Sequence, residues 1–288
     1  MQLVVNGVIA GTMIALLAVG FTIMYMGSRF FVFTYGASYT WAAYTPLLLF
    51  NTLPHIISAF IGIVVAIIIG VLLEAFIYSP TRKRGHSTLV LMLASIGAYT
   101  VLQNIISLFF GDLTRSVRYW TIQEGYSIFT ARITATQLFI ISVSAVVLAA
   151  TSLLLKFTWL GRWLRAVVND EELAQVVGIN VRRTILFATA LGSGLAGVAG
   201  VLISLDTDVM PTMGFQALLL GVLACVIGGV TSLKGAAIGG LFLGLVQHLS
   251  VWLLPTAWQD VILFLILFLF LIIRPQGLLG MPLRKVTV

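Results

Sequence analysis

Long apolar runs are the feature of this sequence that most restricts its fold. Nine of them follow one another, each close to the ~20 residues that a helix needs to cross a bilayer core. They are residues 4–27, 31–50, 56–78, 88–110, 135–156, 184–205, 214–231, 235–254 and 257–273. Of the 288 residues, 60% are hydrophobic and 9% are charged, whereas soluble domains have about 45–50% and about 25%. The sequence therefore predicts an all-α polytopic membrane protein.

We expect about nine transmembrane helices, between eight and ten, in a single membrane domain over residues 1–288. Three of the runs are candidates for broken helices. Residues 31–50 contain several polar side chains, which suits a broken or re-entrant segment lining protein or a water-filled cavity. Residues 214–231 and 235–254 are rich in glycine and could also be split.

The distribution of basic residues predicts the orientation of the chain. If the loop over residues 81–86 is cytoplasmic and the spans alternate, 13 of the 16 Lys and Arg residues fall on the cytoplasmic side. Only Arg115, Arg118 and Arg132 fall outside. This bias is typical of a multi-pass protein of a bacterial inner membrane, with the N-terminus outside and the C-terminus in the cytoplasm. It also explains the net charge of +7 without a nucleic-acid partner.

A polar stretch from Gly161 to Asn180 interrupts the apolar pattern. Asn169 and Glu172 have the spacing of an N-cap and capping box, and Gly178 is placed to end a helix. The stretch therefore predicts one short cytoplasmic helix over residues 170–177, about 12 Å long. Because so short a helix is marginal alone in water, we expect it to be docked against other protein.

This predicted helix has an acidic start and an apolar stripe. The acidic residues of its first turn are Asp170, Glu171 and Glu172. The stripe is formed by Leu173, Val176 and Val177. An alternative is a helix lying on the bilayer surface, but anionic lipid headgroups would repel the acidic end. The pattern favours a helix presented to a partner protein.

Several other function classes lack their characteristic residues. The spans hold no row of carboxylates and no arginine ladder, and the chain has no phosphate-binding loop. Residues 192–197 match the dinucleotide-binding pattern, but they lie inside an apolar run, where small residues favour close helix packing. We therefore expect no cofactor, no metal and no catalytic residue. His248 is interpreted as a hydrogen-bonding residue between helices, and Cys225 as a buried, inert thiol.

Glycine motifs in the C-terminal half carry a family resemblance. They are residues 210–214, 222–229, 231–240 and 243–244. With Asn6-Gly7, Ser95-Ile-Gly97 and Leu102-Gln-Asn104, they resemble the permease subunits of ABC importers for branched-chain amino acids, of the LivH/LivM type and its LivH branch. The likeness to the ribose-type sugar permeases is more distant.

One stretch departs from this family pattern. The second span of the family usually carries a run similar to Asn-Phe-Ala-His-Gly-Glu, and the matching residues here are Val32-Phe-Thr-Tyr-Gly-Ala37. Phe33 and Gly36 are retained, whereas the polar Asn, His and Glu positions are Val32, Tyr35 and Ala37. A different substrate is therefore an open alternative.

The resemblance implies partners and a division of labour. ATP hydrolysis is expected on two cytoplasmic ABC ATPase subunits, and this chain is not expected to be an enzyme. A second permease subunit, in a heterodimer, and a periplasmic substrate-binding protein are the other expected partners. Residues expected to couple the chain to the ATPases are Arg165, Asp170, Glu171, Glu172, Ala174, Gly178, Ile179 and Asn180.

Two further sets of residues have expected roles. Candidates for the substrate pathway are Thr34, Tyr35, Gly36, Ser95, Gln103 and Asn104. The alternative for each polar member is a cap or a hydrogen bond to a neighbouring helix. Residues expected to let helices pack closely are Gly228, Gly229, Gly235, Gly239 and Gly240.

Three other functions compete with the importer permease. A self-sufficient channel or carrier would need a polar or charged ring in the spans. An intramembrane enzyme would need a nucleophile and base in contact, and Cys225 with His248 is the one pair to consider. A sugar permease of the ribose branch would differ in its solute.

Overall fold

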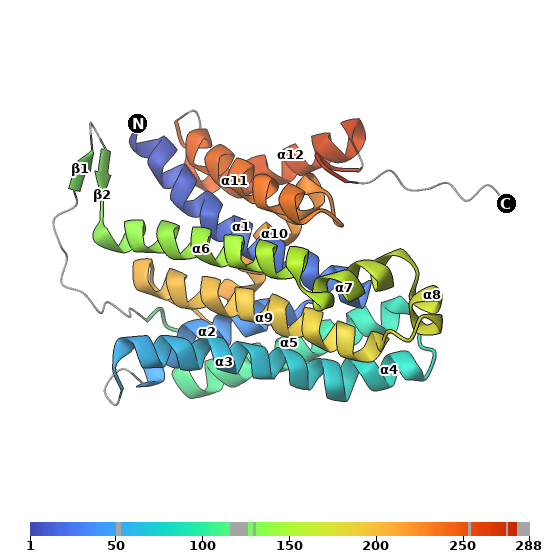
Figure 1. Ribbon diagram of the computed structural model, residues 1–288. Coiled ribbons are helices and arrows are strands. Elements are labelled where there is room, and N and C mark those ends of the chain that lie inside the picture. Colours follow the sequence, from blue (N-terminus) through green and yellow to red (C-terminus); the bar gives the residue numbers. More distant parts are fainter. Residues whose placement is uncertain (50–52, 116–125, 129–130, 253–254, 275, 281–288) are drawn as a thin grey trace.

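The computed structural model describes residues 1–49, 53–115, 126–128, 131–252, 255–274 and 276–280. Helices α3, α6 and α9 run side by side across the molecule, and α1 and α11 cross them at an angle (Figure 1). In chain order they are α1 (Gln2–Ser28), α2 (Thr34–Leu49), α3 (His55–Leu73), the π-helix η1 (Glu74–Tyr78), α4 (Ser79–Lys83), α5 (Thr88–Phe110), β1 (Tyr126–Ile128), β2 (Ala131–Ile133), α6 (Ala135–Phe157), α7 (Trp159–Asn169), α8 (Glu171–Val176), α9 (Val181–Asp206), α10 (Met213–Gly228), α11 (Leu233–Ser250), the 3₁₀-helix η2 (Thr256–Trp258) and α12 (Gln259–Ile273).

Helices α1 and α9 form the centre of the bundle. Both are apolar on every side, the pattern of a helix surrounded by other helices, and 67% of the apolar window of each is buried. Helix α1 packs on α11, α9, α10 and α6, and α9 also contacts α2 and α3. In α3, α5 and α6 only 22% of the corresponding window is buried, so most of their apolar side chains face outward.

The all-α prediction is confirmed for the helical body of the described chain, and one local feature was missed. Strands β1 and β2 pair antiparallel, with Ser127 opposite Arg132. They lie in residues 111–134, for which the sequence predicts a long outer loop, either an ordinary interfacial loop or a site for a soluble partner. The hairpin lies at the end of the bundle opposite α8 (Figure 1). Tyr119 and Trp120 of the same predicted loop lie outside the described residues.

Each of the nine predicted spans corresponds to an apolar helix, but their lengths differ. Within the described residues, five helices are long and apolar enough to cross a membrane. Helices α10 and α11 pass the same test only as a pair, bent by 119° relative to each other. Helices α2 and α12 have 16 and 15 residues. The chain therefore crosses the membrane several times, and the count of nine stays a prediction.

Glycines allow the short helices to approach one another closely. A Cβ atom on Gly36 would collide with the carbonyl of Gly214, which brings the backbones of α2 and α10 into contact. Gly228 and Gly235 meet in the same way across the α10–α11 bend, where Gly229 has a φ of 108°. A Cβ on Gly239 would meet the Ala224 carbonyl. Gly240 faces the backbone of Ala15 in α1.

Candidate functional site

The polar stretch forms two helices rather than one. Helix α7 continues through Asn169, so the N-cap of α8 is Asp170, whose Oδ1 accepts a hydrogen bond from the Leu173 N–H at 3.0 Å. The prediction that Asn169 and Glu172 form a capping box is therefore wrong. Helix α8 itself is shorter than predicted, Glu171–Val176.

The end of α8 forms as the sequence indicates. Gly178 has a φ of 88°, its N–H donates to the Gln175 carbonyl, and the Ile179 N–H donates to the Ala174 carbonyl. These two bonds form a Schellman motif, which requires a left-handed residue at the position of Gly178. Asn180 then caps the next helix, because its Oδ1 accepts from the Arg183 N–H at 3.0 Å.

Helix α8 docks on the bundle through a residue outside the apolar stripe of Leu173, Val176 and Val177. Ala174 is 4% exposed and packs in a small apolar cluster with Val167 of α7 and Val181 and Ile185 of α9. Ala174 projects on the opposite side from the larger side chains, and its small size lets the helix lie close to α7 and α9. The docked face of α8 is thus supplied by one alanine.

The larger apolar side chains of α8 face outward. Leu173, Val176 and Val177 are 62%, 83% and 80% exposed. Glu171 and Glu172 are exposed at the start of the same helix. A compact apolar patch beside two carboxylates, at the end of the molecule, is the type of surface that a partner protein covers.

The α7–α8 segment is joined to the helices of the bundle by arginines. Arg165 Nη1 donates to the carbonyl of Leu155 in α6 at 2.9 Å. The Arg29 guanidinium, just after α1, donates to the carbonyl of Val168 in α7. Arg165 is among the residues expected to couple the chain to the ATPases. The contact that the structure gives its side chain is with α6. These bonds link α7 to α6 and to the end of α1, and α8 packs on α7 and α9.

The pathway candidates of the second predicted span are bonded to neighbouring segments. The Tyr35 hydroxyl donates to the Leu17 carbonyl of α1 at 2.8 Å. The Thr34 hydroxyl lies 2.7 Å from the Tyr78 hydroxyl of η1. Both residues are buried, and Gly36 packs on α10. The geometry agrees with the alternative that these side chains hold helices together, and their pathway roles stay a prediction.

The candidates on α5 have different surroundings. Ser95 is buried; its hydroxyl donates to the Met92 carbonyl at 2.8 Å and accepts from the Phe33 N–H at 3.3 Å. Gln103 is half-buried, whereas Asn104 is exposed and donates to the Thr100 carbonyl of its own helix at 2.7 Å. Asn104 lies in a shallow outward-facing groove along α5 together with Thr100 and Ser107.

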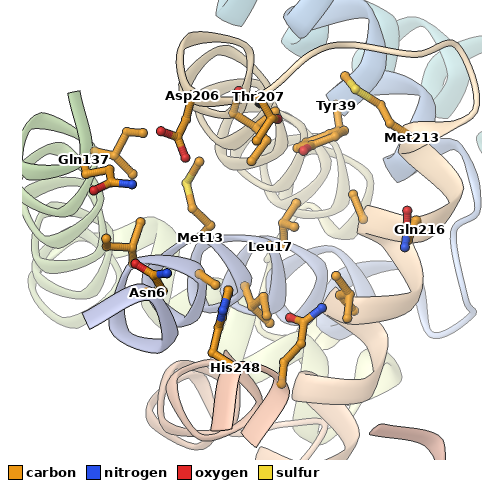
Figure 2. Close-up of a pocket in the computed structure, with 18 of the residues that line it drawn as sticks. Asn6, Met13, Leu17, Tyr39, Gln137, Asp206, Thr207, Met213, Gln216 and His248 are labelled. Atoms are coloured by element: carbon orange, nitrogen blue, oxygen red, sulfur yellow. Dashed lines mark hydrogen bonds between the residues drawn. The ribbon is translucent and has the colours of Figure 1, made fainter. Parts of the chain in front are cut away.

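A cavity that the sequence analysis missed lies among α1, α2, α6, α9, α10 and α11 (Figure 2). Its volume is about 500 Å³, and its lining includes Asn6, Gln137, Asp206 and His248. None of the predicted pathway residues lines it. His248 has no hydrogen-bond partner in the described chain, so the interpretation that it bonds a neighbouring helix is not supported. These four residues come from four separate helices, which is why no linear motif indicated the cavity.

Comparison with known proteins identifies the family. A family model described as "Branched-chain amino acid transport system / permease component" matches residues 3–271. The high-affinity branched-chain amino acid transport system permease protein LivH of Salmonella typhimurium is 33% identical, over 98% of this chain and 96% of its own length. The xylose transport system permease protein XylH of Escherichia coli is 33% identical over 113 residues, 36% of this chain and 29% of its own.

A solved structure shares the fold. PsaBC from Streptococcus pneumoniae in complex with Fab superposes with a TM-score of 0.53 at 16% identity, covering 96% of this chain and 94% of that one. At this identity the likeness concerns the fold alone, whereas the family match extends through most of the sequence. The chain belongs to the family of permease components of branched-chain amino acid transport systems.

Proposed function

We propose that this chain is the membrane-spanning permease subunit of an ATP-driven ABC importer. It would translocate branched-chain amino acids, or a related small polar solute, delivered by a periplasmic binding protein. The observation that carries the proposal is α8, whose apolar residues face outward while Ala174 docks the helix on the bundle. The relatives named as branched-chain amino acid permeases support the solute class.

Helix α8 would couple the chain to its ATPases. The exposed Leu173, Val176 and Val177 would enter an apolar groove of an ATPase subunit, and Glu171 and Glu172 would meet basic residues at its rim. Closure of two ATPase subunits on ATP would push α8, and the contacts of α7 and α9 would carry the movement into the bundle. The chain would remain non-catalytic, with hydrolysis confined to its partners.

The exposed face of α5 supports pairing with a second permease subunit. Thr100, Asn104 and Ser107 share an outward groove with apolar neighbours. Polar groups that face lipid are costly, so such a stripe in a membrane is usually covered by protein or water. A heterodimer that buries this face would place Asn104 beside a pathway between the two subunits.

Co-purification tests the coupling proposal. The double variant Glu171→Lys/Glu172→Lys leaves the Asp170 cap intact, and Val176→Ser/Val177→Ser removes apolar contact area. We expect both to lose ATPase subunits during mild-detergent purification and to lose ATP-dependent uptake of L-leucine. Leu113→Ser, equally exposed at the other end of the bundle, is the matched control. ATPase retention by both double variants, or leucine flux without ATP, would contradict the proposal.

Photo-crosslinking tests the pairing. A benzophenone maleimide attached to Asn104→Cys should crosslink to a second permease subunit, whereas the same label at Ser142→Cys, on the exposed face of α6, should react mainly with lipid. The native Cys225 is buried and should not compete for the label. A crosslink from position 142 and none from 104 would place the interface on α6 instead.

A sugar solute is the second candidate. It is favoured by the match to the xylose permease, which covers 36% of this chain. Competition decides between the two: unlabelled xylose or ribose in excess should leave L-leucine uptake by the complex unchanged. Inhibition by the sugar, or sugar uptake without leucine uptake, would favour the sugar-permease branch.

A further inference from the structure

Helices α6 and α7 meet in a tight turn at the end of the bundle that carries α8 (Figure 1). We refer to residues 154–162, on both sides of this turn, as the α6–α7 elbow. Thr158 ends α6 and begins α7. A Cβ on Gly161 would collide with the Leu155 carbonyl, so the first turn of α7 lies directly against the last turn of α6. Leu164, buried in the main core cluster, anchors α7 on the bundle.

Two aromatic side chains project outward from the elbow. Phe157 is 68% exposed and Trp159 is 67% exposed. Helix α6 has 23 residues, and at 1.5 Å per residue it is about 35 Å long, slightly more than a bilayer core of about 30 Å. As a span, α6 therefore ends at the level of the lipid headgroups, where aromatic side chains are enriched.

Each of these aromatic rings carries a cation on its face. The guanidinium carbon of Arg162 lies 3.9 Å from the centroid of the Trp159 ring. The Lys156 ammonium lies 5.2 Å from the centroid of the Phe157 ring. Both distances are within the range of cation–π interactions. The rings therefore restrict where the two positive charges lie on the surface of the elbow.

The positive charge of the elbow has no counter-charge nearby in the sequence. Residues 135–169, which include all of α6 and α7, contain three basic residues and no Asp or Glu. Arg165 is already bonded to the Leu155 carbonyl. Lys156 and Arg162 have neither an ion pair nor a hydrogen bond in the described chain. Helix α8 instead begins with carboxylates, so the two neighbouring surfaces suit different partners.

A phospholipid headgroup matches this combination of groups. Stacking covers one face of the Arg162 guanidinium and leaves its N–H edge free. That planar edge binds a phosphate through two parallel hydrogen bonds. A free anion would use the cations alone and leave both aromatic rings uncovered, whereas the acyl chains of a lipid cover them. Anionic headgroups are also attracted to basic residues at the membrane surface.

We propose that the α6–α7 elbow binds the headgroup of an anionic phospholipid in the leaflet at the α8 end of the molecule. Arg162 binds the phosphate, and Lys156 supplies a second positive charge. Phe157 and Trp159 pack against the glycerol and the upper part of the acyl chains. The bound lipid holds α7 at the membrane surface beside α8. This site goes beyond the importer function, because it involves neither the solute nor the ATPases.

Titration with two lipids of identical acyl chains tests the proposal. Dioleoyl phosphatidylglycerol or dioleoyl phosphatidylcholine is added to the purified full-length chain, with whatever subunits accompany it. Native mass spectrometry then gives the dissociation constant of the first bound lipid. We expect phosphatidylglycerol to bind at least about tenfold more tightly, because two cations face a headgroup with net negative charge. Equal dissociation constants for the two lipids would overturn the proposal.

A pair of double variants tests whether the elbow is the site. Lys156→Gln/Arg162→Gln removes both charges and should abolish the preference for phosphatidylglycerol. The matched control is Lys83→Gln/Arg84→Gln, which makes the same change in net charge on exposed residues at the same end of the molecule. It should keep the preference. If both double variants lose it equally, lipid binding follows the net charge of the molecule and the assigned site is wrong.

Trp159→Leu tests the stacked arrangement. The substitution keeps an apolar side chain but removes the ring on which Arg162 stacks. It should weaken phosphatidylglycerol binding about two- to fivefold, the effect of losing an exposed cation–π contact. The thermal unfolding midpoint should stay unchanged, because Trp159 is exposed. Binding equal to that of wild type would show that the stacked guanidinium is not the phosphate ligand.

An acidic surface of a partner protein is the competing occupant of the elbow. Co-purification of Lys156→Gln/Arg162→Gln separates the two. We expect the ATPase subunits to be retained while the lipid preference is lost. If the ATPase subunits were lost and the preference for phosphatidylglycerol remained, the elbow would be a protein contact and the lipid site would be wrong.

Discussion

Gly36 and Gly214 set the distance between α2 and α10. Because a Cβ atom on Gly36 would meet the Gly214 carbonyl, Gly36→Ala would force two backbones apart. We expect it to destabilise the fold by about 1–3 kcal/mol, the usual cost of overpacking. The measurement is the thermal unfolding midpoint of the purified chain in detergent.

The matched control is Gly194→Ala in α9. A Cβ there would meet only the Ile67 side chain, at 3.3 and 3.4 Å. Alanine also has a higher helix propensity than glycine, so the midpoint should stay the same or rise. Equal decreases of the unfolding midpoint for the two variants would show that the close α2–α10 backbone contact does not make Gly36 more sensitive to substitution than Gly194.

Glu74 of the π-helix η1 forms an ion pair with Arg82 of α4. Glu74 is buried in η1 and bonds Arg82 Nη1 at 2.9 Å, and its second carboxylate oxygen has no partner in the described chain. Removing one member leaves the other charge uncompensated. We therefore expect Arg82→Met to destabilise the chain by about 3 kcal/mol, at the lower end for a buried pair because Arg82 is partly exposed.

A double-mutant cycle on this pair separates charge from packing. Because Glu74→Gln removes the stranded charge, the double variant Glu74→Gln/Arg82→Met should regain most of the lost stability. The readout is the unfolding free energy of the two single variants and the double variant. Strictly additive losses would indicate that the two side chains contribute independently.

Helix α8 depends on the backbone conformation of the residue that follows it. No atom lies within 4 Å of a Cβ built on Gly178, so a substitution there acts through its φ of 88° alone. Gly178→Ala should weaken the Schellman motif by about 1–2 kcal/mol, because alanine avoids the left-handed region. Hydrogen exchange of the α8 amides should accelerate by roughly tenfold.

Asparagine provides the control at this position. It adopts the left-handed conformation more readily than alanine, so exchange of the α8 amides in Gly178→Asn should stay near the wild-type rate. If Gly178→Ala and Gly178→Asn accelerated exchange equally, the left-handed backbone conformation at position 178 would not be what stabilises the end of α8.

The two ends of the whole molecule differ in their surfaces. One end carries α8 and the basic segment after η1, and the other carries the β1–β2 hairpin and the cavity (Figure 1). If the positive-inside bias sets the orientation, α8 is cytoplasmic. A membrane-impermeant maleimide should then label Asp208→Cys in intact cells, and Ser87→Cys, exposed in the segment between α4 and α5, only after permeabilisation.

The native sequence makes this labelling experiment simple. Cys225 is the one cysteine of the chain, and it is buried, with the Thr22 hydroxyl 3.1 Å from its sulfur. Wild type is therefore expected to remain unlabelled on both sides. Labelling of Ser87→Cys in intact cells would reverse the assigned orientation.

For the whole molecule, the membrane class, the apolar helices and the family were predictable from the sequence alone. Each follows from local properties: about 20 apolar residues make a span in any context, and motif spacing is a property of the chain alone. The left-handed Gly178 was predictable for the same reason, because helix termination depends on neighbouring residues.

Which helix faces are covered could be learned only from the folded chain. The stripe of Leu173, Val176 and Val177 has the spacing of a buried face, yet Ala174 is the residue that docks, because close approach to α7 and α9 admits only a small side chain. Thr34 and Tyr35 are similar: a polar residue in a span gives the same sequence signal whether it lines a pathway or bonds α1 and η1. The cavity around Asp206 depends on six helices meeting in space, and no periodicity within one segment encodes such a meeting.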